Sequence, residues 1–494
     1  MNRRSFLQSA GIGTLAALAG CRSTASRAAT ADRAATADRA ARSNRAATAR
    51  ERPNILLIIA DDQTWRDNGC YGHPDVRTPH IDRLAAEGMR FTHCFTATAM
   101  CAPTRQQLYT GLFPVRNGAY PNHSRVYDGT RSTVHHLRAL GYRVGIVGKH
   151  HFGPRESFPF ENVSAKQVPA FLRRDAAEPF CLIYCSHSPH LPWKEGDASA
   201  YDAANLTLPP YLVDTPQTRQ ALTRYYAEVT DFDREVGECM ARVADAGAEQ
   251  DTIFLYTSEQ GAQFPHGKWT CYDVGLRTAL VVRWPGQVRP GSITDAMVQY
   301  VDVVPTLIEA AGGDPERVDT GCPDARDERG FDGRSFLGVL LGKAKAHRDV
   351  VFGAQTTRGI IVGSDCYPVR SVRNRRYKYI RNLNHETAFH NTLIQHDKTY
   401  WPSWQEKAKT DPKAAYLVRM YEHRPAEELY DIREDPYELE NLADKSALAD
   451  VKADLARRLD AWMAQQGDQG NATEMKARQR QGQGKKKNAK KAGA

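Results

Sequence analysis

The amino-acid sequence predicts an α/β fold in which a large, mostly parallel sheet lies between helices. Apolar segments of strand length alternate along the chain with segments of helical periodicity, which is the order typical of parallel sheets. Residues 54–60 form a continuous apolar run, as expected of a strand that is buried on both faces. Four of the apolar runs also end in a cluster of polar residues, which indicates a site at one edge of the sheet.

The composition agrees with a soluble globular protein. The chain has 494 residues, of which 25% are charged and 41% are hydrophobic. These values exclude disorder, a collagen-like fibre and a coiled coil as the main body. The length predicts two or three domains, or one large α/β body with an appendage.

The net charge of +9 is concentrated at the two ends of the chain. Residues 1–52 carry +7 and residues 476–494 carry +8, which leaves the body between them at about −6. We therefore expect no nucleic-acid partner for the body. Residues 469–494 are predicted to be a basic, disordered tail.

The N-terminal segment has the features of an export signal. Residues 2–8 carry a twin-arginine pattern, residues 10–20 are weakly apolar, and Leu18 to Cys21 resembles a lipobox. We expect residues 1–21 to direct export by the twin-arginine route, with lipid attached at Cys21, giving a periplasmic or cell-surface lipoprotein. Cleavage without lipidation stays open. Residues 22–52 contain a six-residue Ala/Arg-rich repeat and are interpreted as a tether.

The predicted elements of the body follow in chain order. Strands are expected at residues 54–60, 142–147, 180–185, 252–256 and 276–282, and helices at residues 81–91, 133–140 and 218–246. Cys181 and Cys185 fall inside an apolar strand and are expected in the core.

Polar clusters follow four of these strands. They are Asp61-Asp62, Lys149 to His151, His187 to His190, and Glu259-Gln260. The carboxyl ends of parallel strands meet at one edge of a sheet, where ligands bind in open α/β folds. Any one cluster also has a structural interpretation, such as a helix cap for Asp62. The coincidence of four favours a common site.

The residue types at this edge indicate chemistry on an anionic group. Four residues offer only oxygen ligands, which suits calcium or magnesium better than zinc: Asp61, Asp62, Glu259 and Gln260. Three cations would neutralise the oxygens of a transferred phosphoryl or sulfuryl group: Arg105, Lys149 and Lys268. His151 and His190 can exchange protons near neutral pH.

A nucleophile is expected near Cys101, just before a helical segment whose N-terminus carries positive potential. Cys101-Ala102-Pro103-Thr104-Arg105, followed by Leu108-Tyr109-Thr110-Gly111, resembles the signature of the type I (formylglycine-dependent) sulfatases. Further family motifs match in order: Asp61-Asp62, Gly148-Lys149-His150-His151, Pro189-His190, His266-Gly267-Lys268 with Tyr272 and Leu276-Arg277, and Glu428 to Asp431 with Asp435-Pro436 and Asn441-Leu442. The resemblance covers Pro53 to about Asp468.

The resemblance implies a fold, a cofactor and a mechanism. The fold is the alkaline-phosphatase-superfamily sandwich with a smaller C-terminal antiparallel sheet and a packed helix. Cys101 would be oxidised to formylglycine by a formylglycine-generating enzyme, and its hydrate would be both nucleophile and ligand to one calcium ion. Calcium would also be held by Asp61, Asp62, Glu259 and Gln260. Covalent catalysis of this kind divides one difficult step into two.

The remaining roles are also carried over from the resemblance. Arg105 and Lys149 would steady the hydrate, while Lys268 and His190 would bind sulfate and assist the leaving group. His151 would take a proton from the second hydroxyl, which expels sulfate and restores the aldehyde.

Two positions depart from the family pattern. Glu259 stands where the family usually has aspartate, and its extra methylene puts the position of the metal, or the identity of the binding oxygen, in doubt. Thr104 replaces the commoner serine. The segments 258–261 and 267–272 are most similar to bacterial relatives of the heparan N-sulfatases (N-sulfoglucosamine sulfohydrolases), while marine polysaccharides such as carrageenan, fucan or ulvan stay open as substrates. Substrate choice is expected to depend on loops such as 186–210 and 323–333.

The C-terminal part is predicted to contain strands at residues 369–372, 376–380 and 428–431 and a helix at residues 447–465. We place the catalytic domain at residues 53–365 and the C-terminal subdomain at residues 366–468. His385 and His390 are interpreted as surface residues, with contact to substrate as the alternative.

Two other functions stay open. A phosphatase or phosphodiesterase of the alkaline phosphatase superfamily would use a serine or threonine nucleophile and usually two zinc ions, and the oxygen ligands and the cysteine motif count against it. A silent homologue that binds sulfated glycan is suggested only by Glu259.

Overall fold

The computed structural model describes residues 52–175, 177–395 and 400–481. The predicted export signal at residues 1–21, nearly all of the predicted tether and the end of the basic tail lie outside the described residues. Within the described part, no helix is both long and apolar enough to cross a membrane.

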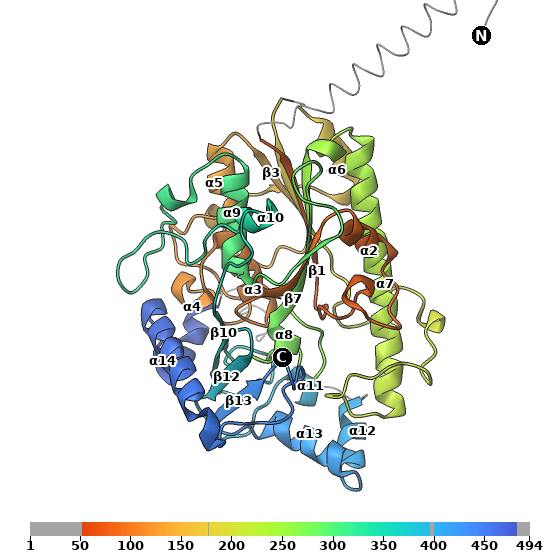
Figure 1. Ribbon diagram of the computed structural model, residues 1–494, viewed down its shortest axis with the longest axis vertical. Helices are drawn as coiled ribbons and strands as arrows, with labels where there is room; N and C mark the ends of the chain where they lie inside the picture. Colours follow the sequence, from red (N-terminus) through yellow and green to blue (C-terminus); the bar gives the residue numbers. More distant parts are fainter. Residues whose placement is uncertain (1–51, 176, 396–399, 482–494) are drawn as a thin grey trace, which may run out of the picture. The chain divides into compact units, whose positions relative to one another are not determined.

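A nine-stranded sheet forms the centre of the fold (Figure 1), and it confirms the predicted α/β class. Its order is β4-β3-β5-β1-β6-β7-β2-β8, with β9 paired to β2. The strands are β1 Asn54–Ala60, β2 Met89–Phe95, β3 Arg143–Gly148, β4 Glu161–Asn162, β5 Phe180–Cys185, β6 Thr252–Ser258, β7 Arg277–Arg283, β8 Ser292–Thr294 and β9 Val298–Gln299. Strands β4, β3, β5, β1 and β6 run parallel, whereas β7 is antiparallel to both β6 and β2.

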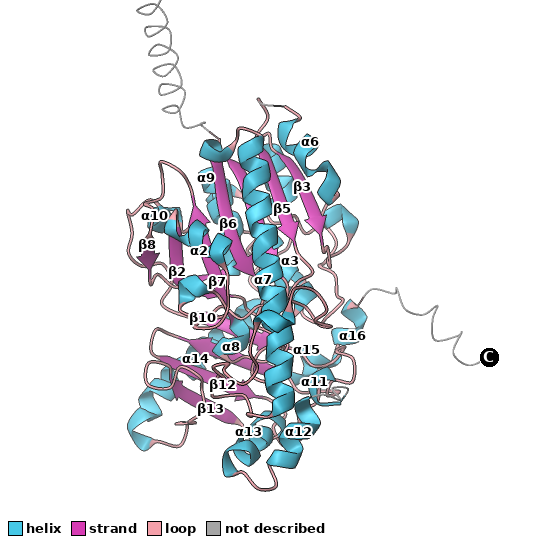
Figure 2. Ribbon diagram, turned by 90° about the vertical axis from the view of Figure 1, so that its right-hand side faces the viewer, coloured by secondary structure: helices cyan, strands magenta, loops and turns pink. Residues whose placement is uncertain are grey.

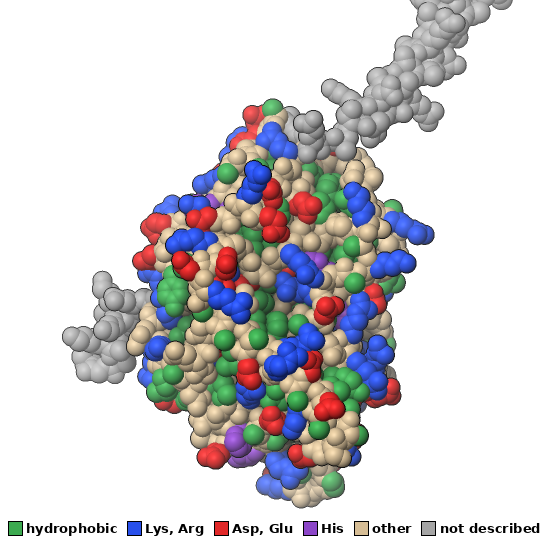
Figure 3. Space-filling model, turned by 60° about the vertical axis from the view of Figure 1, so that its left-hand side comes forward, with side chains coloured by type: hydrophobic (Ala, Val, Ile, Leu, Met, Phe, Trp, Pro, Cys, Tyr) green, Lys and Arg blue, Asp and Glu red, His purple; other side chains and the backbone are tan. Residues whose placement is uncertain are grey.

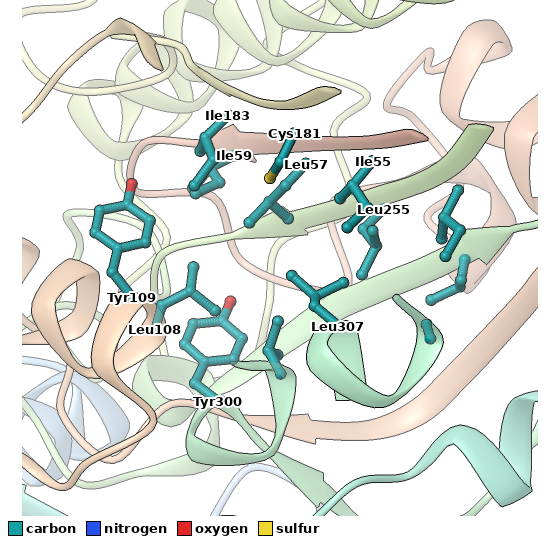
Figure 4. Close-up of a cluster of buried hydrophobic side chains, with 14 of the residues drawn as sticks. Ile55, Leu57, Ile59, Leu108, Tyr109, Cys181, Ile183, Leu255, Tyr300 and Leu307 are labelled. Carbon is teal, nitrogen blue, oxygen red and sulfur yellow. The ribbon is translucent and has the colours of Figure 1, made fainter. Parts of the chain in front are cut away.

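Helices cover both faces of this sheet because alternate side chains of a strand point to opposite sides. Leu56 and Ile58 of β1 pack in one cluster with α2 (Pro79–Ala86), α6 (Val168–Arg173) and α7 (Pro216–Asp245). Figure 2 shows α7 in front of this face. Ile55, Leu57 and Ile59 pack in another cluster with α3 (Cys101–Thr110), α5 (Thr133–Ala139) and α9 (Val303–Ala310), as Figure 4 shows for Leu108 and Leu307. Cys181 and Cys185 lie in this second cluster, which confirms their core assignment.

The predicted helix at residues 81–91 is wrong in its second half. Helix α2 ends at Ala86, and Met89–Phe95 forms β2, which pairs with β7. Gly88 allows this change of direction, since a Cβ there would lie 2.5 Å from the carbonyl oxygen of Val282. The apolar positions Met89 and Phe91 then follow the two-residue period of a strand.

A second, four-stranded antiparallel sheet has the order β10-β11-β12-β13. Its strands are β10 Val351–Gln355, β11 Val369–Arg373, β12 Tyr377–Asn382 and β13 Glu427–Asp431, and α14 (Ala449–Gln466) contacts β11 and β12. Strand β10 pairs along its length with β11, so this sheet begins before residue 366, where the C-terminal subdomain was predicted to start. The other helices are α4 Pro114–Asn117, α8 Asp273–Leu276, α10 Leu337–Leu340, α11 Thr392–Gln395, α12 Tyr400–Lys407, α13 Pro412–Glu422, α15 Asn471–Met475 and α16 Ala477–Arg480.

The predicted disordered tail begins too early. Residues 471–480 form α15 and α16, and Glu474 is buried, accepting hydrogen bonds from the backbone N–H groups of Thr357 and Arg358. A buried carboxylate with such partners ties this segment to the body. Residues 482–494 lie outside the described residues.

The surface carries both signs of charge. On the face shown in Figure 3, Lys and Arg side chains are interspersed with Asp and Glu.

A buried ion pair joins β11 to the segment that follows α14. Arg370 Nε donates to Asp468, and both side chains are 0% exposed. Burial opposes ionisation of Asp468, but Arg370 outweighs it and lowers the pKa of this carboxyl. We expect Asp468→Asn to destabilise the protein by about 3–5 kcal/mol, because it leaves a buried arginine unpaired. Urea unfolding measures this loss.

The control for this pair is Asp460→Asn, which removes an exposed partner of Arg381 and should cost less than about 1 kcal/mol. Because the folded-state pKa of Asp468 is lowered, its contribution to stability is present above the unfolded pKa and is lost as the pH falls through the folded pKa. Equal stability losses in the two variants would contradict a structural role for the buried pair.

Candidate active site

The polar clusters predicted at the strand ends come together around Cys101, the first residue of α3. Cys101 Sγ lies 4.0 Å from Asp62 Oδ1 and 3.4 Å from Gln260 Nε2. Backbone hydrogen bonds fix the loops that carry the clusters. Asp61 N donates to Ser188 O at 3.0 Å, and Glu259 N donates to Ala60 O at 3.0 Å. The sequence alone was therefore sufficient to predict that these polar clusters come together at one edge of the sheet.

Two backbone features position the side chains from β3 and from the later lysine segment. Gly148 has a φ of 80°, and a Cβ there would meet Cys185 O at 1.9 Å, so only glycine can precede Lys149 in this turn. Trp269 N donates to Ala99 O at 2.8 Å, which holds the Lys268 segment beside the start of α3. Asp62 and Trp269 are themselves left-handed, with φ of 64° and 67°. Non-glycine residues in this region are strained, and such strain clusters at functional sites.

Three cations bind the carboxylates of the site. Lys149 Nζ donates to Asp61 Oδ2 at 2.5 Å, and Lys268 Nζ donates to Asp62 Oδ2 at 2.5 Å. Arg105 Nε donates to Glu259 Oε2 at 2.5 Å, and Lys149 Nζ lies 3.3 Å from the other oxygen of Glu259. Apart from Lys149, which is slightly exposed, these side chains are essentially buried.

Burial and charge together set the ionisation of the site. Burial raises the pKa of Asp61 well above its usual range, with Glu259 adding to the effect. Burial also opposes the charge of Glu259, but Arg105 and Lys149 outweigh it and hold the pKa of Glu259 well below its usual range. For Lys268, the attraction of Asp62 overcomes burial and raises the pKa.

The thiol of Cys101 is a poor nucleophile in this environment. Burial, reinforced by Glu259, raises the pKa of Cys101 to about 12. The thiolate is the nucleophilic form of cysteine, so the unmodified side chain would be almost entirely inactive at neutral pH. Conversion of Cys101 to another functional group is consistent with this property.

The site fits a hard cation. Ligand atoms of Asp61, Asp62, Cys101 and His190 all lie within 4.8 Å of one another. Asp61 Oδ1 and Gln260 Oε1 are buried oxygens without a hydrogen-bond partner among the described residues. Buried oxygens of this kind suit calcium or magnesium. Glu259 is not one of these four clustered residues. One of its carboxylate oxygens accepts from Arg105, and the other lies near Lys149 and the Gln260 amide.

Two predicted histidines border the site, together with one that the sequence did not indicate. His190 Nε2 lies 3.5 Å from Asp62 Oδ2, and its Nδ1 lies 2.5 Å from Leu191 O. Burial, with Lys268, lowers the pKa of His190. His151 Nε2 lies 2.9 Å from His123 Nδ1, and burial, with Lys149, lowers the pKa of His151 to about 3. Both histidines are therefore neutral at physiological pH.

The site opens into a cavity with a volume of about 540 Å³. Seven lining residues were not predicted from the sequence: Asn122, His123, Glu228, Gln263, Trp269, Ile361 and Thr392. Trp269 could have been found, because it follows Lys268 directly. The predicted loop 186–210 contributes six lining residues, whereas no residue of 323–333 is among them: His187, Ser188, His190, Leu191, Pro192 and Glu195. That second loop instead wraps around Arg116, which donates to Glu328 O and Gly330 O.

Comparison with known proteins identifies the family. The sulfatase family profile matches residues 53–164 and 157–313, and the profile of the N-sulphoglucosamine sulphohydrolase C-terminal region matches residues 264–410. An ulvan-active sulfatase of Formosa agariphila is 32% identical over 435 residues, covering 85% of this chain and 81% of the relative. Human N-sulphoglucosamine sulphohydrolase is 30% identical over 466 residues, covering 84% and 90%.

A solved structure shares the fold. A Bacteroides fragilis protein assigned as a sulfatase superposes with a TM-score of 0.67 at 20% identity, covering 86% of this chain and 98% of that one. The match of the family profile to more than half of the chain agrees with the site geometry and with the relatives. The chain therefore belongs to the sulfatase family and is a sulfuric ester hydrolase.

Proposed function

We propose that the protein hydrolyses sulfate esters or sulfamates on sulfated glycans, using Cys101 after its conversion to formylglycine and one calcium ion. The observation that carries the proposal is the position of Cys101, which begins a buried helix at the base of a cavity, among carboxylates and cations. The relatives named for activity on ulvan and on N-sulphoglucosamine support a glycan substrate.

In this proposal, the hydrated aldehyde would supply a hydroxyl nucleophile, and a bound calcium ion would supply positive charge for the sulfate oxygens. Asp61, Asp62 and the Gln260 side-chain oxygen would hold the cation. Glu259 anchors Arg105 and Lys149 instead of offering a free carboxylate. The side chain of Glu259, one methylene longer than aspartate, thus fits a role in holding Arg105 and Lys149 in position.

The remaining side chains handle sulfate and protons. Lys268, paired with Asp62, would neutralise sulfate oxygens. His190 donates from Nδ1 to the Leu191 carbonyl, so Nε2 of the neutral ring carries no proton. Nε2 lies 3.5 Å from Asp62 and would take up a proton there, with the carboxylate as counter-charge, before giving it to the leaving group. His151 is held neutral by burial, the form that accepts a proton, and would take one from the second hydroxyl.

Release of sulfate from defined sugars tests this function. We expect free sulfate from N-sulfoglucosamine or from ulvan oligosaccharides, and slower hydrolysis of the matching phosphate esters. Faster phosphate release would favour the phosphoesterase alternative. Binding of sulfated sugar without sulfate release, on protein with Cys101 converted, would favour the silent homologue.

Calcium should stabilise the folded protein as well as activate it. At a calcium concentration about 100 times the dissociation constant, we expect about 2.7 kcal/mol of added stability, visible as a rise in Tm. Asp61→Asn should abolish most of that rise, whereas Asp128→Asn, at an exposed carboxylate, should preserve it. Chelation should lower sulfate release. No shift of Tm with calcium would contradict calcium as the resident cation.

We also propose that the protein is exported by the twin-arginine route and anchored by lipid at Cys21. A formylglycine-generating enzyme would act on Cys101 during maturation. The Cys21→Ala variant is expected in the soluble fraction, while the unchanged protein should sediment with membranes. Equal partition of the two would contradict the anchor.

A further inference from the structure

A second cavity lies apart from the active site. Its volume is about 310 Å³, and it shares no lining residue with the catalytic cavity. Four segments form it: residues 64–74, 207–211, 273–277 and 436–437. The first of these segments begins two residues after Asp62, so the cavity lies on the loop that also carries the predicted metal ligands.

Aromatic rings and an arginine dominate the lining of this cavity. The Arg66 guanidinium carbon lies 4.6 Å from the ring centroid of Trp65 and 4.9 Å from that of Tyr437. Tyr437 also packs on Tyr211, with centroids 5.8 Å apart. Among the residues that the structure describes, the guanidinium of Arg66 has no hydrogen-bond acceptor, and its side chain is only half-buried. Its planar set of N–H donors is thus available to a ligand.

The charges around Arg66 favour an anion. A second lining arginine, Arg277, lies 3.8 Å from the Trp65 ring and donates to Thr92 O. The acidic lining residues are already engaged. Asp67 accepts from Tyr225 Oη at 2.7 Å, and Asp273 accepts from Lys378 Nζ at 2.9 Å and from Arg373. Burial raises the pKa of Asp67, and His73, Tyr225 and Arg66 act against that shift.

We propose that this second cavity binds one anionic sugar residue, bearing sulfate or carboxylate, outside the catalytic centre. The guanidinium fork of Arg66 would bind the anionic group in bidentate geometry, which arginine provides and lysine does not. The rings of Tyr437 and Tyr211 would cover the apolar face of the sugar. The proposal rests on the proposed function only in that a sulfated glycan would supply such residues.

Calorimetric titration of the full chain tests the cavity. Glucosamine 6-sulfate and glucuronate serve as probes, and glucose is the neutral counterpart. To remove the contribution of the catalytic site, the titration is repeated in the Lys268→Ala background. We expect saturable binding of both anions in that background, no binding of glucose, and a loss of about tenfold or more in affinity with Arg66→Gln.

Two further variants make the result specific. Tyr437→Leu should weaken binding by removing a ring without changing charge. Arg174→Gln is the matched control, because Arg174 also lies over an aromatic ring, 5.2 Å from the Phe171 centroid, but at the end of α6, where it pairs with Glu161. Binding that is unchanged in both Arg66→Gln and Tyr437→Leu would overturn the proposal.

Kinetics distinguish the source of the sugar. If it belongs to the polymer being cleaved, Arg66→Gln should raise KM for a sulfated oligosaccharide and leave KM for a monosaccharide unchanged. If it is a separate molecule, both KM values should stay the same while binding is lost. Sulfate release from the monosaccharide tests the proposed function independently, so failure of either proposal is seen separately.

Discussion

Replacing Cys101 with serine is expected to abolish turnover while leaving the fold intact. A serine at this position would supply a hydroxyl of similar size at the start of α3, but it could not form an aldehyde hydrate. Sulfate transferred to that hydroxyl would have no second hydroxyl to expel it. We therefore expect a fall in kcat of at least about a thousandfold, the scale on which loss of a covalent nucleophile acts.

The measurement is steady-state sulfate release together with the intact mass of the variant after incubation with substrate. At most one sulfate per chain should be retained. The control is Cys181→Ala, which removes a buried thiol from β5 that lies in the hydrophobic core, away from the site. That control should lose some stability and keep its kcat. Normal turnover by Cys101→Ser would contradict the role assigned to Cys101.

Removing Lys268 is the second change with a large expected effect. Lys268 is 2% exposed, and its Nζ lies 2.5 Å from Asp62 Oδ2. In the proposed mechanism this cation neutralises sulfate oxygens in a site shielded from water, where such contacts have their greatest effect. We expect Lys268→Ala to lower kcat/KM by a factor of about 10²–10³.

The control for this variant is another buried lysine. Lys378 is 1% exposed and pairs with Asp273 and Glu438. Lys378→Ala should lower Tm, because it unpairs buried carboxylates, yet kcat of the folded fraction should be preserved. If both variants lowered kcat equally, Lys268 would have only a structural role.

The central strands and the site residues that follow them could be predicted because one physical pattern specifies both. A parallel strand buried on both faces must be apolar along its length, as residues 54–60 are, and the first polar residues after it emerge at the edge where ligands bind. Asp61, Lys149 and Glu259 were located in this way. The antiparallel strand β2 was not, because Met89 and Phe91 also fit a helical face, and only Gly88 marked the break.

The rest of the site depends on contacts that no local pattern encodes. His123 reaches His151 from a loop 28 residues earlier in the chain, and Ile361 reaches the cavity from beyond β10. The actual partners of Glu259 were also unpredictable, since they depend on where Arg105 and Lys149 point in space. Strand β10 escaped prediction because its five residues include Gly353, which weakens a strand pattern.

The mass of the peptide that contains Cys101 shows whether this residue is converted to formylglycine. The protein should be made in a host with a formylglycine-generating enzyme, with a known sulfatase processed in parallel. We expect the mass loss that accompanies conversion of a thiol to an aldehyde at Cys101 and at no other cysteine. An intact thiol at Cys101, with the reference sulfatase converted, would contradict it.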